Sequence, residues 1–262
     1  MRTITSNGAT LNVRVDGPDN GPVVLFANSL GTDLRVWELL LPHLPSDLRI
    51  VRYDKRGHGL SDCPDAPYKI DTLVSDAEAV IDALGLTDVI FVGLSIGGLI
   101  GQGLAARRPD AIRALVLMDT AAKIGSPGMW QNRIVTLQTD GMGSMVDGIL
   151  DRWFAPEMRN DPTRLSPWRN MLLRTPLEGY VGCCAAIAEA DFTESTSQLT
   201  LPVMAMAGSE DGSTTPEIVQ ATASLCNAAF HVVAGAGHLP CVEAPEAVGA
   251  LITDFLKEVR HV

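Results

Sequence analysis

Residues 89–107 read VIFVGLSIGGLIGQGLAAR, and this stretch decides the fold that we expect. Its first part, Val89–Leu94, is a continuous apolar run, which is typical of a strand buried on both faces of a sheet. Its second part, Ile96–Arg107, is rich in small residues and predicts a helix that Pro109 stops. A strand that runs directly into a helix in this way is typical of a parallel sheet covered by helices.

The turn between this strand and this helix contains the first candidate catalytic residue. Gly93, Ser95 and Gly97 fit the pattern G-x-S-x-G. A sharp turn forces the central serine into a strained backbone conformation and crowds the residues two positions away, and glycine at both places relieves that crowding. We therefore expect the Ser95 hydroxyl to stand at the carboxyl end of the sheet as a nucleophile, beside the free N–H groups of a helix N-terminus.

Short apolar runs on both sides of this stretch extend the same pattern. Strand–helix–strand alternation predicts an α/β fold with a mostly parallel sheet and helices on both faces. Asp71 is the expected N-cap of a helix over Asp71–Leu84, and a closing helix is expected over Pro245–Val259. The other strands are expected at Thr10–Val15, Pro22–Ala27, Leu48–Tyr53, Ile112–Met118, Pro202–Ala207 and Phe230–Val233.

The pattern changes over residues 120–198, where no buried-strand run occurs. Segments with helical spacing are broken there by several prolines, which indicates a set of short helices. We therefore expect a core domain made of residues 1–119 and 199–262, with a helical cap of residues 120–198 inserted in it. Because the insertion leaves the sheet at its carboxyl edge, it is expected to roof the nucleophile.

Composition excludes several classes of function. The 262 residues carry a net charge of −11, which argues against nucleic acid as a partner because phosphate binding needs a basic surface. An anionic substrate would need specific Arg or Lys side chains nearby. No apolar run approaches the roughly 18 residues of a membrane helix, and the first residues contain no apolar signal segment, so we expect no membrane partner.

The five cysteines indicate a reducing compartment. Cys63, Cys183, Cys184, Cys226 and Cys241 are odd in number and form no C-x-x-C pair, which argues against a disulfide framework and against a zinc site. Free thiols persist in the cytoplasm, which is the expected location. We expect each cysteine to pack as a small apolar side chain, although Cys183 and Cys184 could also line a pocket.

A serine nucleophile needs a general base. His238 is the best candidate, because it lies in a loop just after the last expected strand, at the same sheet edge as Ser95. His58 is expected to have a structural role in a turn after an earlier strand. The other histidines are expected inside a strand (His231), at the surface (His43) and in a fraying tail (His261).

The base in turn needs an acid that orients it and stabilises its charged form. Asp211 follows the strand expected at Pro202–Ala207, and the chain order Ser, Asp, His is the one found in this architecture. Glu210 and Asp119 are the alternative acids. The expected oxyanion hole consists of two backbone N–H groups, those of Ile96 and of Leu30 in the loop after the strand Pro22–Ala27.

Several segments together resemble a known family. They are residues 26–33 (FANSLGTD) with Trp37, 53–62 (YDKRGHGLSD), 93–102 (GLSIGGLIGQ), 119–125 (DTAAKIG), Trp130 with Arg133, 152–154 (RWF) and 178–191 (EGYVGCCAAIAEAD). The chain resembles the α/β-hydrolases and, among them, the 3-oxoadipate enol-lactonases. The segments in the first half are shared by many hydrolases, whereas those from residue 119 to 191 look like the lactonase cap.

The resemblance implies a substrate and a mechanism. The family's substrate is a small anionic enol-lactone with an acetate arm, and its opening to 3-oxoadipate is a step of the β-ketoadipate pathway of aromatic compound degradation. Ser95, His238 and Asp211 would form an acyl-enzyme and hydrolyse it, with no metal and no organic cofactor. Arg133 would bind the carboxylate, and Trp130 and Trp153 would wall the ring. The sequence does not indicate an oligomeric state.

Other functions remain open at this point. The same triad would serve a general carboxylesterase or a cofactor-free perhydrolase. A haloalkane dehalogenase is disfavoured because its nucleophile is an aspartate, and position 95 is a serine. A ligand-binding receptor on a hydrolase fold is the alternative from another class. The remaining cations of the insertion, most of them expected on a solvated face, are Lys123, Arg152, Arg159, Arg164, Arg169 and Arg174.

Overall fold

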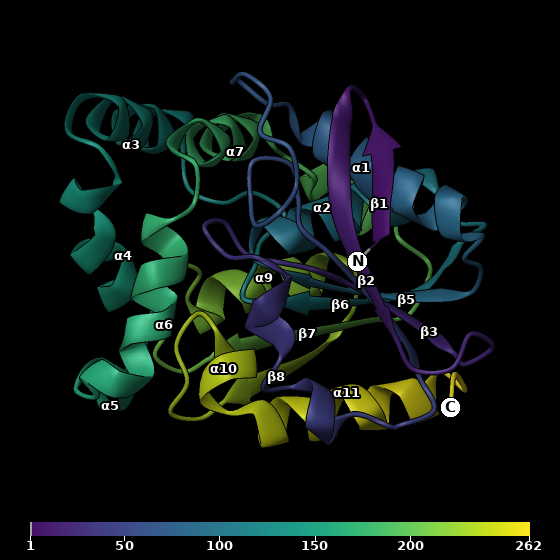
Figure 1. Ribbon diagram of the computed structural model, residues 1–262. Helices are drawn as coiled ribbons and strands as arrows, with labels where there is room; N and C mark the ends of the chain where they lie inside the picture. Colours follow the sequence, from purple (N-terminus) through teal and green to yellow (C-terminus); the bar gives the residue numbers. More distant parts are fainter. Residues whose placement is uncertain (1) are drawn as a thin grey trace.

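A single eight-stranded sheet organises the molecule (Figure 1). The structure, a computed structural model, describes residues 2–262. The strand order is β1-β2-β4-β3-β5-β6-β7-β8; β2 is antiparallel to both β1 and β4, and all later pairs are parallel. The mostly parallel sheet predicted from the sequence is thus confirmed. The strands are β1 (Arg2–Ser6), β2 (Ala9–Asp16), β3 (Val23–Ala27), β4 (Arg49–Tyr53), β5 (Val89–Leu94), β6 (Ile112–Met118), β7 (Val203–Gly208) and β8 (Ala229–Val233).

Helices flank the sheet, and a separate group of helices stands at one end of it. Figure 1 shows α1 and α2 on one side of the sheet and α11 on the other. The helices are α1 (Ile70–Leu84), α2 (Ile96–Arg107), α3 (Pro127–Asp140), α4 (Val146–Trp153), α5 (Pro156–Arg159), α6 (Pro162–Leu173), α7 (Leu177–Glu189), α8 (Thr193–Ser197), α9 (Pro216–Leu225), α10 (Pro240–Glu243) and α11 (Pro245–Glu258), with short 3₁₀ turns at Leu34–Trp37, Leu41–His43 and Met142–Ser144.

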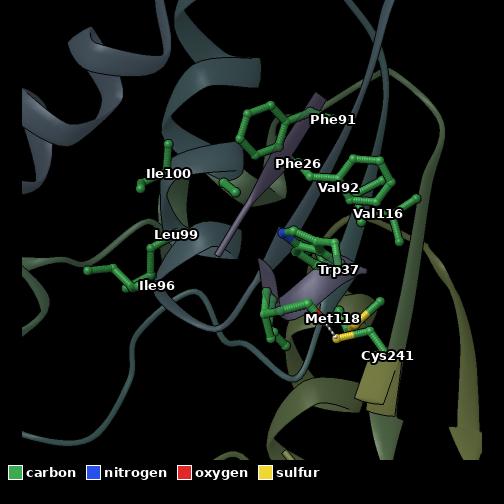
Figure 2. Close-up of a cluster of buried hydrophobic side chains, with 14 of the residues drawn as sticks. Phe26, Trp37, Phe91, Val92, Ile96, Leu99, Ile100, Val116, Met118 and Cys241 are labelled. Atoms are coloured by element: carbon green, nitrogen blue, oxygen red, sulfur yellow. Dashed lines mark hydrogen bonds between the residues drawn. The ribbon is translucent and has the colours of Figure 1, made fainter. Parts of the chain in front are cut away.

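The central strands of the sheet are shielded from solvent, and they are apolar on both faces. Every residue of β3, β5 and β7 is buried. Figure 2 shows how side chains from β3, β5, β6 and α2 gather with Trp37 in one cluster. The rings of Phe26 and Trp37 lie 4.8 Å apart, and the Trp37 indole N–H donates to Asn28 Oδ1 at 2.7 Å. The strand that carries Ser95 is therefore fixed in a rigid core.

The group of helices at the end of the sheet is the segment expected to form a cap. Residues 120–198 contain α3 to α8 and no strand. In Figure 1 the helices α3, α4, α5 and α6 stand beside the sheet rather than over its flanking helices. The regular structure of this segment is all helical, as the sequence predicts, while the division into a core of residues 1–119 and 199–262 and a cap of residues 120–198 stays a prediction.

Some local predictions were wrong. Asp71 does not cap α1: the helix begins at Ile70 with Lys69 in the N-cap position, and the Asp71 carboxylate pairs with Arg107 instead. His261 is not in a fraying tail, because it is buried and its Nε2 lies 3.1 Å from the Val23 carbonyl oxygen. The strand β1 and the helix α9 were not predicted; β1 contains a single apolar residue, Ile4, whereas α9 does have a buried face, which includes Val219 and Ala223.

The cysteines and the helices also test two sequence predictions, that every cysteine is a buried free thiol and that no segment spans a membrane. All five cysteines are free thiols. Cys183, Cys184 and Cys241 are buried, as expected, but Cys63 is exposed, which contradicts the expectation that every cysteine packs in the interior. Within residues 2–262 no helix combines the length and the apolar character that crossing a bilayer would require.

Candidate active site

Ser95 sits at the sharp turn between β5 and α2, as the sequence predicts. Its backbone has φ 58° and ψ −118°, a conformation that side-chain-bearing residues rarely adopt. Two hydrogen bonds hold it there: the Ser95 N–H donates to the Met118 carbonyl at 2.9 Å, and Thr120 Oγ1 donates to the Ser95 carbonyl at 2.6 Å. The strain is therefore maintained by the end of the neighbouring strand β6.

The two glycines of the turn are required by close backbone contacts. A Cβ on Gly93 would lie 2.3 Å from the Gly97 carbonyl oxygen, and one on Gly97 would lie 2.1 Å from the Ala27 carbonyl oxygen. Neither contact can relax by rotating a side chain, because both involve backbone oxygens. The steric reason for the G-x-S-x-G pattern is thus present in this chain.

His238 and Asp211 meet at the same edge of the sheet. His238 follows β8 and Asp211 follows β7, and both are almost fully buried. His238 Nδ1 lies 2.9 Å from Asp211 Oδ2. Thr214 Oγ1 also donates to Asp211 Oδ2 at 2.8 Å, and the Ser213 N–H donates to Oδ1 at 2.7 Å. Burial alone would raise the pKa of Asp211, but the charge and hydrogen bond of His238 lower it below its usual value.

Hydrogen bonds connect the loop that carries His238 to the helical segment of residues 120–198. The His238 N–H donates to the Trp153 carbonyl at 2.8 Å. The carboxylate of Glu243 accepts from the Gly237 N–H at 2.7 Å and from the Ala155 N–H at 2.9 Å, so it bridges the two segments. Movements of the helices around Trp153 would therefore reach the imidazole directly.

Ser95 and His238 line one cavity, together with Ser29 and Leu30. His238 Nε2 lies 3.5 Å from Ser29 Oγ. Within residues 2–262, no hydrogen bond joins Ser95 Oγ to His238, so the serine and the imidazole share the cavity without being hydrogen-bonded to each other. Apo active sites often hold such groups at a looser spacing than the reacting complex does.

The loop of the expected oxyanion hole lies beside the nucleophile. Neither the Leu30 N–H nor the Ile96 N–H donates to an acceptor among the residues that the structure describes. Ile96 begins α2, where the first N–H groups lack partners inside the helix. Both groups thus lack a competing acceptor, as the expected oxyanion hole requires, and Leu30 lines the cavity.

Two buried side chains fix this loop. Lys55 Nζ donates to the Ser29 carbonyl at 2.6 Å and to the Thr32 carbonyl at 3.1 Å. The Gly31 N–H donates to His58 Nε2 at 2.9 Å. The structural role expected for His58 is therefore present, whereas the role of Lys55 was missed because a lysine after a strand ordinarily faces solvent.

The two alternative acids behave differently. Glu210 is exposed, and its carboxylate accepts from the neighbouring Ser209 hydroxyl, so it does not approach His238. Asp119 is fully buried, and atoms of Asp119, Asp211 and His238 lie within 4.8 Å of one another. Within residues 2–262 these three side chains are the one His/Cys/carboxylate group whose spacing alone would suit a metal ion, but the hydrogen bond between His238 Nδ1 and Asp211 Oδ2 accounts for this spacing, so we do not assign them as metal ligands.

The cavity above Ser95 has a volume of about 460 Å³ and is walled mainly by the helical segment. Trp130, Arg133 and Trp153, the residues predicted to contact substrate, all line it, while the buried Cys183 and Cys184 do not. Arg152 also lines it, although the sequence offered no reason to separate this residue from the other arginines of residues 120–198, most of which were expected on a solvated face. The other lining residues are Ile124, Gly125, Met129, Tyr180, Ile187, Gly212, Ser213, Thr214 and Ile218.

Two arginines give this cavity a positive charge. The Arg133 guanidinium lies 4.7 Å from the centre of the Trp130 ring, a cation–π contact that holds its position. Burial, and then the charge of Arg133, lower the pKa of Arg152. Neither arginine has a carboxylate partner within residues 2–262, whereas four other cations of the segment are paired with acids: Lys123, Arg159, Arg164 and Arg169.

Comparison with known proteins places the chain in a family. A family description, the alpha/beta hydrolase fold, matches residues 22–245. The chain belongs to this α/β-hydrolase family, and it is a hydrolase. The fold class predicted from the sequence is therefore confirmed.

Individual relatives within this family show which of its enzymes the chain is similar to. The chain is 34% identical to the 3-oxoadipate enol-lactonase 2 of Acinetobacter baylyi, over 97% of this chain and 96% of that one. It is similar to the crystal structure of the enol-lactonase from Burkholderia xenovorans LB400, with a TM-score of 0.93, 36% identity, and coverage of 98% and 100%. A thermophilic esterase from Thermogutta terrifontis, solved with malate bound, has a TM-score of 0.91 at 27% identity, with coverage of 100% and 99%. The resemblance to the enol-lactonases is thus confirmed.

Proposed function

We propose that this protein hydrolyses 3-oxoadipate enol-lactone to 3-oxoadipate, in the cytoplasm, by a Ser-His-Asp mechanism. The observation that carries the proposal is the pair of unpaired arginines, Arg133 and Arg152, in the cavity that also holds Ser95 and His238. Two like charges in a half-buried site need an anion to neutralise them. A small lactone with a carboxylate arm matches a cavity of about 460 Å³ with mainly apolar walls and two arginine side chains.

The chemistry follows from the roles of the three side chains. His238 removes the proton of the Ser95 hydroxyl, and Oγ attacks the lactone carbonyl. The tetrahedral oxyanion accepts hydrogen bonds from the Leu30 and Ile96 N–H groups. The ring C–O bond breaks, His238 gives its proton to the leaving enolate oxygen, and the resulting enol tautomerises to the ketone.

A second half-reaction releases the product. Water attacks the Ser95 ester with His238 as base, the second tetrahedral intermediate collapses, and Ser95 regains its proton as 3-oxoadipate leaves. Asp211 keeps the imidazole in the right tautomer and stabilises the imidazolium in both steps. Because the enol becomes a ketone, the open product does not readily close again.

The chain's own side chains must move slightly for this to happen. In the structure His238 Nε2 lies 3.5 Å from the Ser29 hydroxyl and has no hydrogen bond to Ser95 Oγ, so the imidazole or the Ser95 hydroxyl turns when substrate binds. The tie between His238 and Trp153 offers a route, since substrate that contacts the helical segment would also bias the position of the imidazole.

A general carboxylesterase is the second candidate, supported by the similarity to the Thermogutta terrifontis esterase. The two candidates are distinguished by measuring kcat/KM for the enol-lactone and for p-nitrophenyl acetate, a neutral ester. We expect a preference for the enol-lactone of at least about a hundredfold, because only that substrate can engage the arginines. Equal turnover of both, or faster turnover of the neutral ester, would make the protein a general esterase.

A further inference from the structure

A second carboxyl group lies buried beside the proposed catalytic acid. Asp119 follows β6 with a φ of 45° and no exposed surface. Its Oδ1 accepts a hydrogen bond from the Gly208 N–H at 2.9 Å. Its Oδ2 is equally buried and has no donor within residues 2–262. A buried carboxylate oxygen without a donor is costly, so the state of this group needs a physical explanation.

Asp211 is the nearest group that can supply that explanation. A carboxyl oxygen of Asp119 lies within 4.8 Å of one of Asp211 and of a ring nitrogen of His238. Asp211 accepts three hydrogen bonds, from His238, Thr214 and the Ser213 N–H, whereas Asp119 accepts one. Donors stabilise the ionised form of a carboxyl group, so Asp211 is the member of the pair that carries the charge.

The surroundings of Asp119 also disfavour a second negative charge. Two buried carboxylates this close cannot both ionise without strong repulsion. The titratable groups that face Asp119 are Asp211, His238, Glu243 and Cys241, and only the imidazole can become positive. Burial, and then the charge of Asp211, raise the pKa of Asp119 well above its usual range.

We propose that Asp119 is a neutral carboxylic acid whose Oδ2 hydroxyl donates a hydrogen bond to Asp211, which makes Asp119 a positioning residue for the Asp211–His238 pair. This inference rests on the proposed function in so far as Asp211 and His238 act in catalysis. It explains why Oδ2 has no donor, since a hydroxyl needs an acceptor instead. It also leaves one negative charge beside the imidazole rather than two.

The substitution Asp119→Asn tests this charge state. An asparagine can accept from Gly208 with its oxygen and donate to Asp211 with its amide, so it reproduces the neutral acid. We expect kcat to stay within about threefold of the wild-type value. A change of that size corresponds to less free energy than the loss of one hydrogen bond. The acidic limb of the kcat/KM profile should not move. If Asp119 were ionised, removing its charge would make the imidazolium less favourable and shift that limb downward by ~1 pH unit.

The substitution Asp119→Ala provides the contrast. It removes the donor to Asp211, so we expect kcat to fall about tenfold with KM unchanged. Recovery by asparagine but not by alanine would identify the hydrogen bond, rather than the charge, as the contribution of this position. Equal rates for wild type, Asn and Ala would overturn the positioning role.

An infrared measurement decides the charge state without any substrate. At pH 7 the wild-type protein should show the carbonyl stretch of a buried protonated carboxyl group, and Asp119→Asn should remove it. Glu210→Gln is the matched control, because Glu210 lies next to Asp211 in the chain but is exposed, and it should leave the band intact. A spectrum in which Asp119→Asn removes no such band would overturn the inference. If the enol-lactone is not the substrate, the rates can be taken with p-nitrophenyl acetate, so failure of the proposed function and failure of this inference are separate results.

Discussion

Ser95 shows how one residue connects backbone strain to chemistry. Its left-handed backbone is maintained by hydrogen bonds from Ser95 to Met118 and from Thr120 to Ser95, so the hydroxyl is held at the end of β5 before any substrate arrives. We expect Ser95→Ala to lower kcat by several orders of magnitude, as the loss of the nucleophile does in serine hydrolases. Thermal unfolding should stay close to that of the wild type, because alanine needs no new space. Turnover near the wild-type rate would contradict the proposed mechanism.

The glycines of the turn allow a test that separates packing from chemistry. Gly97→Ala would place a Cβ 2.1 Å from the Ala27 carbonyl oxygen, so the backbone of β3 or α2 must shift. We expect a loss of about 1–3 kcal/mol in the free energy of unfolding, the usual cost of overpacking, together with a loss of activity.

Gly128→Ala is the matched control for this substitution. Gly128 lies in the first turn of α3, and a Cβ there would meet no atom within 4 Å. Alanine should therefore leave stability unchanged or raise it by up to about 1 kcal/mol, the difference in helix propensity. Urea unfolding of the two variants checks the pair, and equal destabilisation of both would refute the steric account of the turn.

At the scale of elements, two helices of the segment 120–198 determine the charge of the cavity. Arg133 comes from α3 and Arg152 from α4, and both reach the cavity that Ser95 lines. We expect Arg133→Gln and Arg152→Gln each to raise KM for the enol-lactone roughly tenfold or more, since each loses one charge-assisted hydrogen bond to the carboxylate. Turnover of p-nitrophenyl acetate should change little.

Arg169→Gln is the control for these variants. Arg169 lies on α6, pairs with Asp147, and does not line the cavity, so its removal should leave KM for both substrates unchanged. Steady-state kinetics with the two substrates checks the set. A rise in KM for the neutral ester in the cavity variants would mean that the arginines shape the site rather than bind the carboxylate.

At the scale of the whole molecule, the sequence was most informative where local sterics and burial act alone. The bounds of β5 and α2 were predicted to the residue, because a buried apolar run and a G-x-S-x-G turn leave few alternatives. The Asp211–His238 contact was predicted for a related reason. Both residues follow parallel strands, whose carboxyl ends meet at one edge of the sheet.

The sequence was least informative where a role depends on distant contacts. Lys55 supports the Ser29 carbonyl, and nothing near it in the chain distinguishes it from a surface lysine. Arg152 differs from Arg159 or Arg169 only because α4 turns it into the cavity, away from any carboxylate. The contact between His238 Nε2 and the Ser29 hydroxyl depends on side-chain packing, which sequence patterns do not reveal.

The protonation state of His58 affects the stability of the whole fold. It is buried under the loop of the proposed oxyanion hole, where its Nε2 accepts the Gly31 N–H and therefore must remain unprotonated. Burial, and then the charge of Lys55, lower the pKa of His58 well below the ordinary value of 6.5. In the unfolded chain the same imidazole binds a proton near its ordinary pKa.

The sign of the resulting pH dependence can be worked out from this difference. Below pH 6.5 the unfolded state binds a proton that the folded state does not, so stability falls as the pH is lowered. The slope for this one group approaches about 1.4 kcal/mol per pH unit. Other buried groups also contribute to the wild-type slope, since the pKa values of Asp119 and Glu243 are raised in the folded state, so the contribution of His58 is measured as a difference between variants. In urea unfolding between pH 7.5 and 5.0, His58→Gln, which keeps an acceptor for Gly31 but cannot titrate, should lower the slope of stability against pH by up to about 1.4 kcal/mol per pH unit relative to the wild type. His43→Gln removes an exposed histidine and should leave the slope as it is. If His58→Gln changes the slope no more than His43→Gln does, the loop does not depend on an unprotonated His58.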